Sequence, residues 1–132
     1  MNITLKEAQN IIDSAIKTSN LNNLKMNIAI VDTGANLVAF ARMDGAWLGS
    51  LDISIKKAKT AIFFDMPTGK IGELSQPGNP LFNIEHSNGG LITFPGGLPI
   101  YCEDGHLIGA IGVSGGSVDM DHWVAEAAIQ IK

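Results

Sequence analysis

The sequence contains one cysteine and no long apolar run. Cys102 has no partner for an internal disulfide, which fits a reducing compartment. No apolar run approaches the roughly 20 residues that a membrane-spanning helix needs. The N-terminus lacks a basic segment followed by an apolar one, which predicts that no signal peptide is present. We therefore expect a cytoplasmic protein that has no membrane partner.

Charged residues are scarce, at 17% of the chain, compared with about 25% in an average protein. The net charge is −4, and no basic run or basic–aromatic stripe occurs. Nucleic acid is therefore not expected as a partner. A surface with few charges favours contacts between subunits, so we expect a homo-oligomer.

The length of 132 residues corresponds to a single domain, 1–132. Thr4 and Glu7 have the spacing of a capping box, and an apolar stripe follows, which predicts a first helix. A second helix is expected after the segment Gly45 to Gly49. A short helix after Met66-Pro67 and a last helix after Gly115-Gly116 are also expected. The apolar stripe of the last helix contains Met120, Val124, Ala127, Ala128 and Ile131.

Alternating or apolar segments bounded by turn residues predict strands. Asp32 to Asn36 has turn chemistry, with Gly34 expected to supply a positive φ. Asp104-Gly105 is a two-residue hairpin signal. The expected strands are Met26 to Val31, Leu37 to Met43, Leu91 to Phe94, Leu98 to Glu103 and Leu107 to Val113. The predicted fold is α+β, a five-stranded and largely antiparallel sheet with flanking helices over one face, in the order α-β-β-α-(α)-β-β-β-α.

Two glycine motifs near the C-terminus do not predict catalysis. Gly112-Val113-Ser114-Gly115-Gly116 matches G-x-S-x-G, but only one helix follows it, which leaves no room for a separate acid and histidine. The even spacing of Gly109, Gly112 and Gly115 differs from that of a dinucleotide-binding loop. We expect these glycines to permit a tight turn and close packing, and we expect no catalytic residue here.

The three histidines are weak candidates for a metal or haem iron. His122 lies on one helical face with Asp119 and Glu126, where a solvated polar face is the preferred interpretation. His106 follows a hairpin turn and is expected to be exposed. His86 lies in the irregular segment Gln76 to Gly90, and a loop of that length is usually functional or mobile. It is the best of the three, although an ordinary surface histidine is at least as good an explanation.

Arg42 ends a predicted strand, and Asp44 begins the loop that follows it. An arginine there can bind a carboxylate in bidentate fashion, either that of Asp44 or that of a ligand. Trp47, in the same glycine-bounded loop, is costly to leave in water. We expect Trp47 to pack in a subunit interface or over a pocket.

Three segments resemble the GlcG/HbpS family of haem-binding or haem-degrading-type domains. They are VDTGANLVAFARMDGAWLGSLDISIKKAKTA, QPGNPLFNIEHSNGGLITFPGGLPI and GAIGVSGGSVDMD, which together span most of the chain. The C-terminal domain of PduO-type corrinoid adenosyltransferases is similar. The resemblance implies a profilin-like, PAS-related fold. Arg42 and Asp44 fall in its R-M-D-G-A segment, and Gln76 and Asn88 fall in its Q-P-G and S-N-G-G segments, where they contact a small ligand or satisfy loop backbone.

The resemblance implies a small-molecule ligand, haem or another tetrapyrrole such as a corrinoid, and a setting in glycolate, glycerol or diol utilisation. It implies Arg42 as a partner for a haem propionate. Two alternatives remain open. One is an enzyme, haem-degrading or otherwise, that uses Arg42, Asp44 and His86 in one pocket. The other is an oligomeric interaction module without a ligand.

Overall fold

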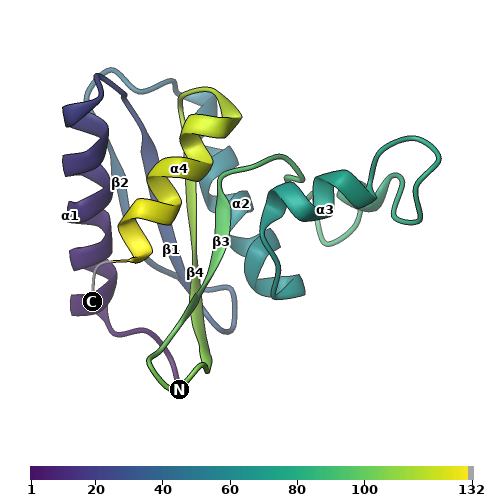
Figure 1. Ribbon diagram of the computed structural model, residues 1–132, viewed down its shortest axis with the longest axis horizontal. Helices are drawn as coiled ribbons and strands as arrows, with labels where there is room; N and C mark the ends of the chain where they lie inside the picture. The colour runs from purple at the N-terminus through teal and green to yellow at the C-terminus, as the bar shows by residue number, and fades with distance from the viewer. Residues whose placement is uncertain (131–132) are drawn as a thin grey trace.

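A computed structural model describes residues 1–130 of the chain. It contains an antiparallel sheet of four strands in the order β2-β1-β4-β3 (Figure 1). The predicted α+β class and the antiparallel sheet are therefore confirmed. The elements are α1 Leu5–Leu21, β1 Asn27–Asp32, β2 Leu37–Arg42, α2 Gly49–Phe64, α3 Thr68–Leu74, the 3-10 helix η1 Ile84–His86, β3 Gly97–Tyr101, β4 Leu107–Ser114 and α4 Val118–Ile129. Ile131, expected on the last helix, lies outside the described residues.

The predicted fifth strand, Leu91 to Phe94, is wrong. This segment packs on helices instead of joining the sheet. The backbone N–H of Ile92 donates to Thr60 Oγ1 on α2 at 3.2 Å. The Thr93 carbonyl lies so close to Gly72 on α3 that a Cβ on Gly72 would come within 1.9 Å of its oxygen. The order is therefore α-β-β-α-α-β-β-α.

The helices cover both faces of the sheet, which corrects the expectation that they cover only one (Figure 1). Successive strand residues point to opposite faces. Ile28 and Ile30 of β1 pack with α1 and α4, whereas Ala29 and Val31 pack with α2. The α2 side uses small residues, so this helix lies very close to the sheet. The domain therefore has three layers, with α1 and α4 on one face of the sheet and α2 on the other.

Several local signals hold as predicted. Thr4 and Glu7 form a complete capping box at the start of α1. Asp32 Oδ1 accepts from the backbone N–H groups of Gly34 and Asn36, both at 2.9 Å. The positive φ of this turn, however, falls on Ala35 at 63° and not on Gly34.

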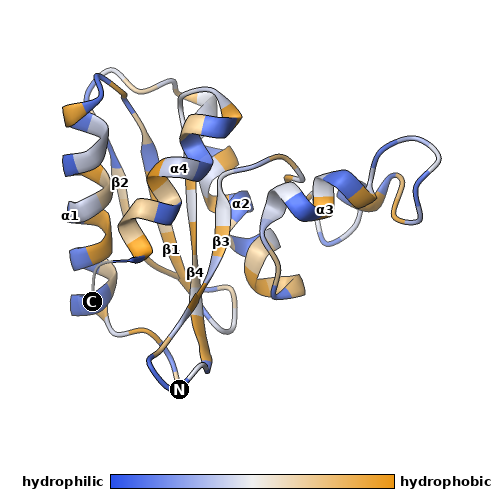
Figure 2. Ribbon diagram, in the orientation of Figure 1, coloured by the Kyte–Doolittle hydropathy of each residue, from blue (hydrophilic) through white to orange (hydrophobic). Residues whose placement is uncertain are grey.

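A projecting segment, residues 67–95, lies beyond β3 and is called the arm below (Figure 1). It contains α3 and η1. Figure 2 shows both polar and apolar residues along it. Two hydrogen bonds of Thr68 Oγ1 fix its base, since this oxygen accepts from Gly97 N–H at 2.9 Å and donates to Gly97 O at 3.4 Å.

Among residues 1–130, the structure contains no helix with the length and apolar character needed to cross a membrane.

Candidate functional site

A pocket lies where the end of α1 meets the end of β2, and it is called the α1–β2 pocket below. Its volume is about 470 Å³. It is lined by Ile16, Asn20, Asn23, Leu24, Lys25, Arg42, Met43 and Asp44. Both Arg42 and Asp44, which the sequence singles out, therefore lie at one site.

The pocket combines apolar walls with two cationic side chains. Lys25 extends over Gly45, because a Cβ at Gly45 would lie 3.1 Å from Lys25 Nζ. Neither Lys25 nor Arg42 forms an ion pair with any acidic residue in the described range 1–130. The alternative in which Arg42 is tied to Asp44 is therefore not what the structure contains, and both cations remain available to a ligand.

The loop that leaves the pocket leads to two exposed apolar side chains. Trp47 is 70% exposed and Leu48 is 73% exposed. The buried side chain of Asn27 holds this loop, since its Nδ2 donates to Trp47 O at 3.2 Å. Its Oδ1 has no hydrogen-bond partner among the described residues. Trp47 lines neither of the two described pockets, so its indole faces outward.

The other predicted ligand residues lie on the arm. Gln76 Nε2 donates to Gly72 O at 2.8 Å and so stabilises the end of α3. Asn88 has a φ of 52°, and its Nδ2 donates to Ser87 Oγ at 3.0 Å. His86 is exposed at the end of η1. Because β2 and β3 are opposite edges of the sheet, one chain does not bring Gln76, His86 and Asn88 to Arg42 and Asp44.

The remaining histidines also lie away from the α1–β2 pocket. His122 lines a second pocket of about 310 Å³ with residues of α3 and with Pro95 and Asp119. Its Nε2 lies 3.6 Å from Glu126 Oε2. His106 follows the β3–β4 turn and is exposed, as expected. Within residues 1–130 no three His, Cys, Asp or Glu side chains are grouped to hold a metal ion.

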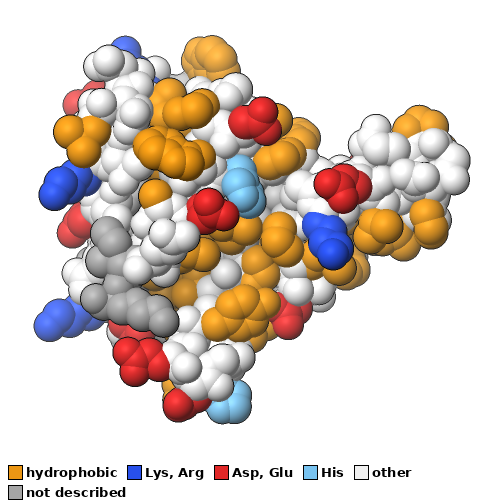
Figure 3. All heavy atoms as spheres, viewed as in Figure 1, with side chains coloured by type: hydrophobic (Ala, Val, Ile, Leu, Met, Phe, Trp, Pro, Cys, Tyr) orange, Lys and Arg blue, Asp and Glu red, His pale blue; other side chains and the backbone are white. Residues whose placement is uncertain are grey.

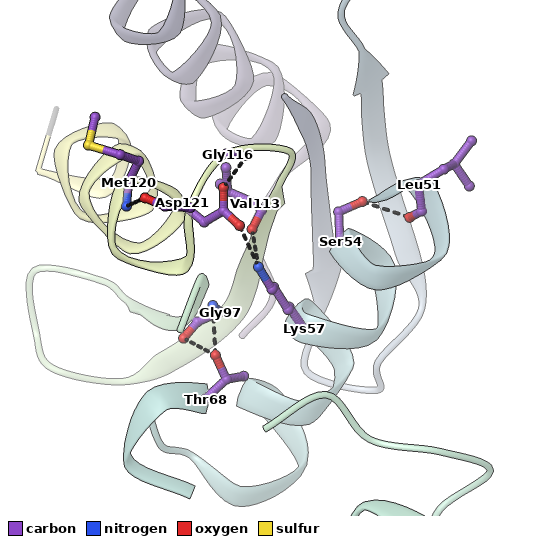
Figure 4. Close-up of polar contacts among 10 residues, drawn as sticks. Leu51, Ser54, Lys57, Thr68, Gly97, Val113, Gly116, Met120 and Asp121 are labelled. Atoms are coloured by element: carbon purple, nitrogen blue, oxygen red, sulfur yellow. Dashed lines mark hydrogen bonds and ion pairs between the residues drawn. The ribbon is translucent and has the colours of Figure 1, made fainter. Parts of the chain in front are cut away.

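A buried ion pair joins α2 to α4 (Figure 4). Lys57 Nζ lies 2.9 Å from Asp121 Oδ2 and donates to Val113 O at 2.8 Å. The other carboxylate oxygen of Asp121 accepts from Gly116 N–H at 2.8 Å. The Phe94 ring lies over the ammonium group, 5.0 Å from Nζ to the ring centroid. Desolvation lowers the pKa of Lys57 and raises the pKa of Asp121, and in each group the charge of the other opposes that shift.

The sequence interpretation misses this ion pair, although each of its two residues lies on a helical face that is otherwise made of small or apolar residues. In the sequence, Lys57 looks like one of several lysines along the second helix, and Asp121 looks like an acidic residue at the start of the last helix. Lys57 shares a helical face with Ser54, Ala58 and Ala61, all of which are buried. Asp121 is followed at helical spacing by an apolar stripe, all 0% exposed, made of Val124, Ala125 and Ala128. A charge within an apolar stripe indicates a buried partner.

The fold and the α1–β2 pocket define a small α+β domain with an amphiphilic pocket at the edge of an antiparallel sheet. The family model described as "Haem degrading protein HbpS-like" matches residues 3–130. The chain belongs to this HbpS-like family, as its sequence motifs predict.

Individual relatives agree with this assignment. The 15.0 kDa protein in the dhaT-dhaS intergenic region of Citrobacter freundii is 40% identical over 108 residues, which cover 81% of this chain and 75% of that protein. Protein ORFY of Klebsiella pneumoniae has a similar structure, with a TM-score of 0.93, 36% identity and coverage of 97% of this chain and 88% of that chain. A PduOC:heme complex is also similar, with a TM-score of 0.92, 31% identity and coverage of 98% and 94%.

Proposed function

We propose that this protein binds a small ligand, haem or another tetrapyrrole such as a corrinoid, as a cytoplasmic homo-oligomer. The observation that carries the proposal is the α1–β2 pocket. It joins apolar side chains and two cations without ion-pair partners among residues 1–130. A tetrapyrrole with carboxylate side chains has a flat apolar ring and anionic groups at its rim, and this pocket offers partners for both.

The pocket residues fit these two parts of the ligand. Ile16, Leu24 and Met43 supply the apolar contact surface. Arg42 can form two parallel hydrogen bonds to one carboxylate, and Lys25 can supply a point charge to a second. Arg42 and Asp44 thus have different roles: Arg42 contacts the ligand, and Asp44 supplies polar surface to the pocket lining.

The donor set is incomplete for an iron ligand. No histidine lines this pocket. Its one sulfur donor, Met43 Sδ, accepts from Met26 N–H at 3.4 Å. The described residues around this pocket therefore supply contacts for the ring and the carboxylates of a tetrapyrrole, but no imidazole for a bound iron.

The comparisons support the ligand class. The similar PduOC structure is a complex with haem, and the matching family model is described as haem-degrading. The family resemblance further supports a role in glycolate, glycerol or diol utilisation.

A haemin titration followed by absorbance tests the proposal. We expect a saturable Soret shift in the wild-type protein. Arg42→Ala and Lys25→Ala should each weaken binding about fivefold, because exposed charge pairs are worth about 1 kcal/mol. Lys6→Ala removes an exposed lysine elsewhere on α1 and should change nothing. His86→Ala, His106→Ala and His122→Ala identify any imidazole ligand. A non-saturating shift shared by all variants would rule out a defined haem site.

A second candidate function is an interaction module without a ligand. The exposure of Trp47 and Leu48 favours it, since large apolar side chains at a loop tip mark contact surfaces. Failure of the haemin titration together with a stable assembly would support this function. The enzymatic alternative needs Arg42, Asp44 and His86 in one pocket, and a single chain separates them.

A further inference from the structure

A second pocket lies between α4 and the base of the arm, and it is called the α3–α4 pocket below. Its volume is about 310 Å³. Four ionisable side chains line it, Lys70 and Glu73 from α3 and Asp119 and His122 from α4. On the face seen in Figure 3, acidic, basic and histidine side chains gather where α4 approaches α3. The α1–β2 pocket uses none of these groups.

The charged groups of the α3–α4 pocket do not neutralise one another. Lys70 and Glu73 are one helical turn apart, a spacing that allows an ion pair, but they form none. Asp119 likewise has no ion-pair partner among residues 1–130. Within the same range the ion-pair contact of His122 is to Glu126, with 3.6 Å between Nε2 and Oε2. Opposite charges therefore line one cavity without pairing across it.

A buried contact fixes the α4 wall of this pocket. Asp121 lies between Asp119 and His122 in α4, and its carboxylate forms the ion pair with Lys57 (Figure 4). The side chains of this pair are 0% and 3% exposed. The helical turn that presents Asp119 and His122 to the pocket is thereby joined to α2.

The α3 wall is fixed in a similar way. Thr68 Oγ1, at the start of α3, accepts from Gly97 N–H at 2.9 Å. Gly69 packs against Pro95, because a Cβ at Gly69 would lie 3.0 Å from Pro95 Cγ. Pro67, Gly69 and Pro95 also line the pocket and supply its rigid apolar part. A pocket whose walls are already in place binds a ligand at a lower cost in conformational entropy.

The lining selects a ligand that carries both signs of charge. An anion alone would lie near the carboxylates of Glu73 and Asp119, and a cation alone would lie near Lys70. A molecule with an ammonium group and a carboxylate satisfies both, through charge-assisted hydrogen bonds. The volume is at the lower end of the roughly 300–1,000 Å³ of small-molecule sites. This combination fits an α-amino acid, in which one carbon carries both groups.

We infer that the α3–α4 pocket binds a free α-amino acid. Lys70 binds its carboxylate, Glu73 and Asp119 bind its ammonium group, and the two prolines of the lining contact its side chain. His122 lies in the same lining and reports on occupancy. The site is separate from the α1–β2 pocket, so the inference goes beyond the proposed function and does not depend on it.

Nuclear magnetic resonance of the histidine Cε1–H groups tests the inference, because the chain has only three histidines. The signals are assigned with His86→Ala, His106→Ala and His122→Ala. L-Alanine is then titrated into the wild-type protein at constant pH and ionic strength, without haemin. We expect a saturable shift of the His122 signal, with the other two unchanged. Acetate and methylamine each carry one of the two charges and should need about tenfold higher concentrations.

Variants of the lining identify the contacts. Lys70→Ala and Asp119→Asn replace exposed side chains and should each weaken L-alanine binding at least about fivefold. Lys17→Ala and Asp13→Asn remove exposed charges on α1 and serve as matched controls that should leave binding unchanged. Circular dichroism of all four variants checks that the fold is retained.

Three results would overturn the inference. The recognised groups are common to all α-amino acids, so a His122 signal that does not respond to L-alanine rejects the site. Equal responses to L-alanine and acetate would reduce the effect to a general response to anions. Unchanged binding in both Lys70→Ala and Asp119→Asn would place the ligand elsewhere. The haemin titration is independent, since a Soret shift without an L-alanine response retains the proposed function and rejects only the amino acid site.

Discussion

Lys57 on α2 and Asp121 on α4 meet at the end of β4, so one ion pair connects helices that cover opposite faces of the sheet. The side chains are 0% and 3% exposed, and 2.9 Å separates Nζ from Oδ2. Each charge has lost its water and depends on the other and on a few backbone groups. Removing either side chain therefore leaves a buried charge without compensation.

We predict that Lys57→Met and Asp121→Asn each lower the free energy of unfolding by about 3–5 kcal/mol. The double variant should lose less than the sum of the two, because neither charge then remains alone. Urea denaturation of the four proteins measures the coupling between the two sites.

The neighbouring lysine provides a matched control. Lys56 pairs with Asp52 one turn away at 3.1 Å, with side chains 36% and 68% exposed. Lys56→Met should change the free energy of unfolding by no more than about 0.5 kcal/mol, as is usual for exposed pairs of this spacing. If Lys56→Met and Lys57→Met were equally destabilising, the buried pair would not be the important contact.

Gly112 of β4 sets the distance between the sheet and α2. A Cβ at this position would lie 1.9 Å from Ser54 O and 2.6 Å from Ala58 N. Both are backbone atoms of α2, which cannot move without shifting the whole helix. We predict that Gly112→Ala destabilises the protein by about 3 kcal/mol, the upper end of the usual cost of overpacking a core, because backbone atoms cannot give way as a side chain can.

Gly49→Ala is the matched control for Gly112→Ala. Gly49 begins α2, and an added Cβ there would meet no atom within 4 Å. This variant should be neutral or stabilising by up to about 1 kcal/mol, because alanine is the better helix former. Thermal and urea unfolding of both variants would show whether glycine at 112 is needed for packing.

The sequence predicts those features that depend on nearby residues. The capping box of Thr4 and Glu7, the Asp104-Gly105 hairpin and the alternation of β1 are all local, and the structure contains them. The predicted position of the positive φ in the Asp32 turn is wrong because Asp32 Oδ1 binds both Gly34 and Asn36, which leaves Ala35 to turn the chain.

Features set by distant contacts cannot be predicted in the same way. Leu91 to Phe94 has the composition of a strand. Its backbone, however, hydrogen-bonds to Thr60 and packs against Gly72, which lie far earlier in the chain. For the candidate site, Arg42 and Asp44 are predicted together because they are two residues apart. Their distance from His86 depends on strand order, since β2 and β3 lie at opposite edges of the sheet.

Tyr101 is the single tyrosine of the chain, which makes its ionisation directly measurable. Its hydroxyl donates to the carboxylate of Asp65, the residue that caps α2 with a φ of 49°. This hydrogen bond, with smaller effects of burial and of the carboxylate charge, raises the pKa of Tyr101 to about 12. We predict that absorbance at the tyrosinate band rises around pH 12 in the folded protein, as checked by circular dichroism at each pH.

Asp65→Asn tests the cause of this shift, since asparagine tolerates the left-handed backbone and removes the charge. In this variant the pKa of Tyr101 should return toward the ordinary value of 10.0. The pKa of Tyr101 is higher in the folded protein than in the unfolded chain, so its hydrogen bond stabilises the fold only while the hydroxyl is protonated. The stabilisation is complete below pH 10 and is lost as the pH rises through about 12. A wild-type midpoint near 10 while the protein is still folded would mean that Tyr101 and Asp65 are not bonded in solution, and β3 would then be free of α2 at that end.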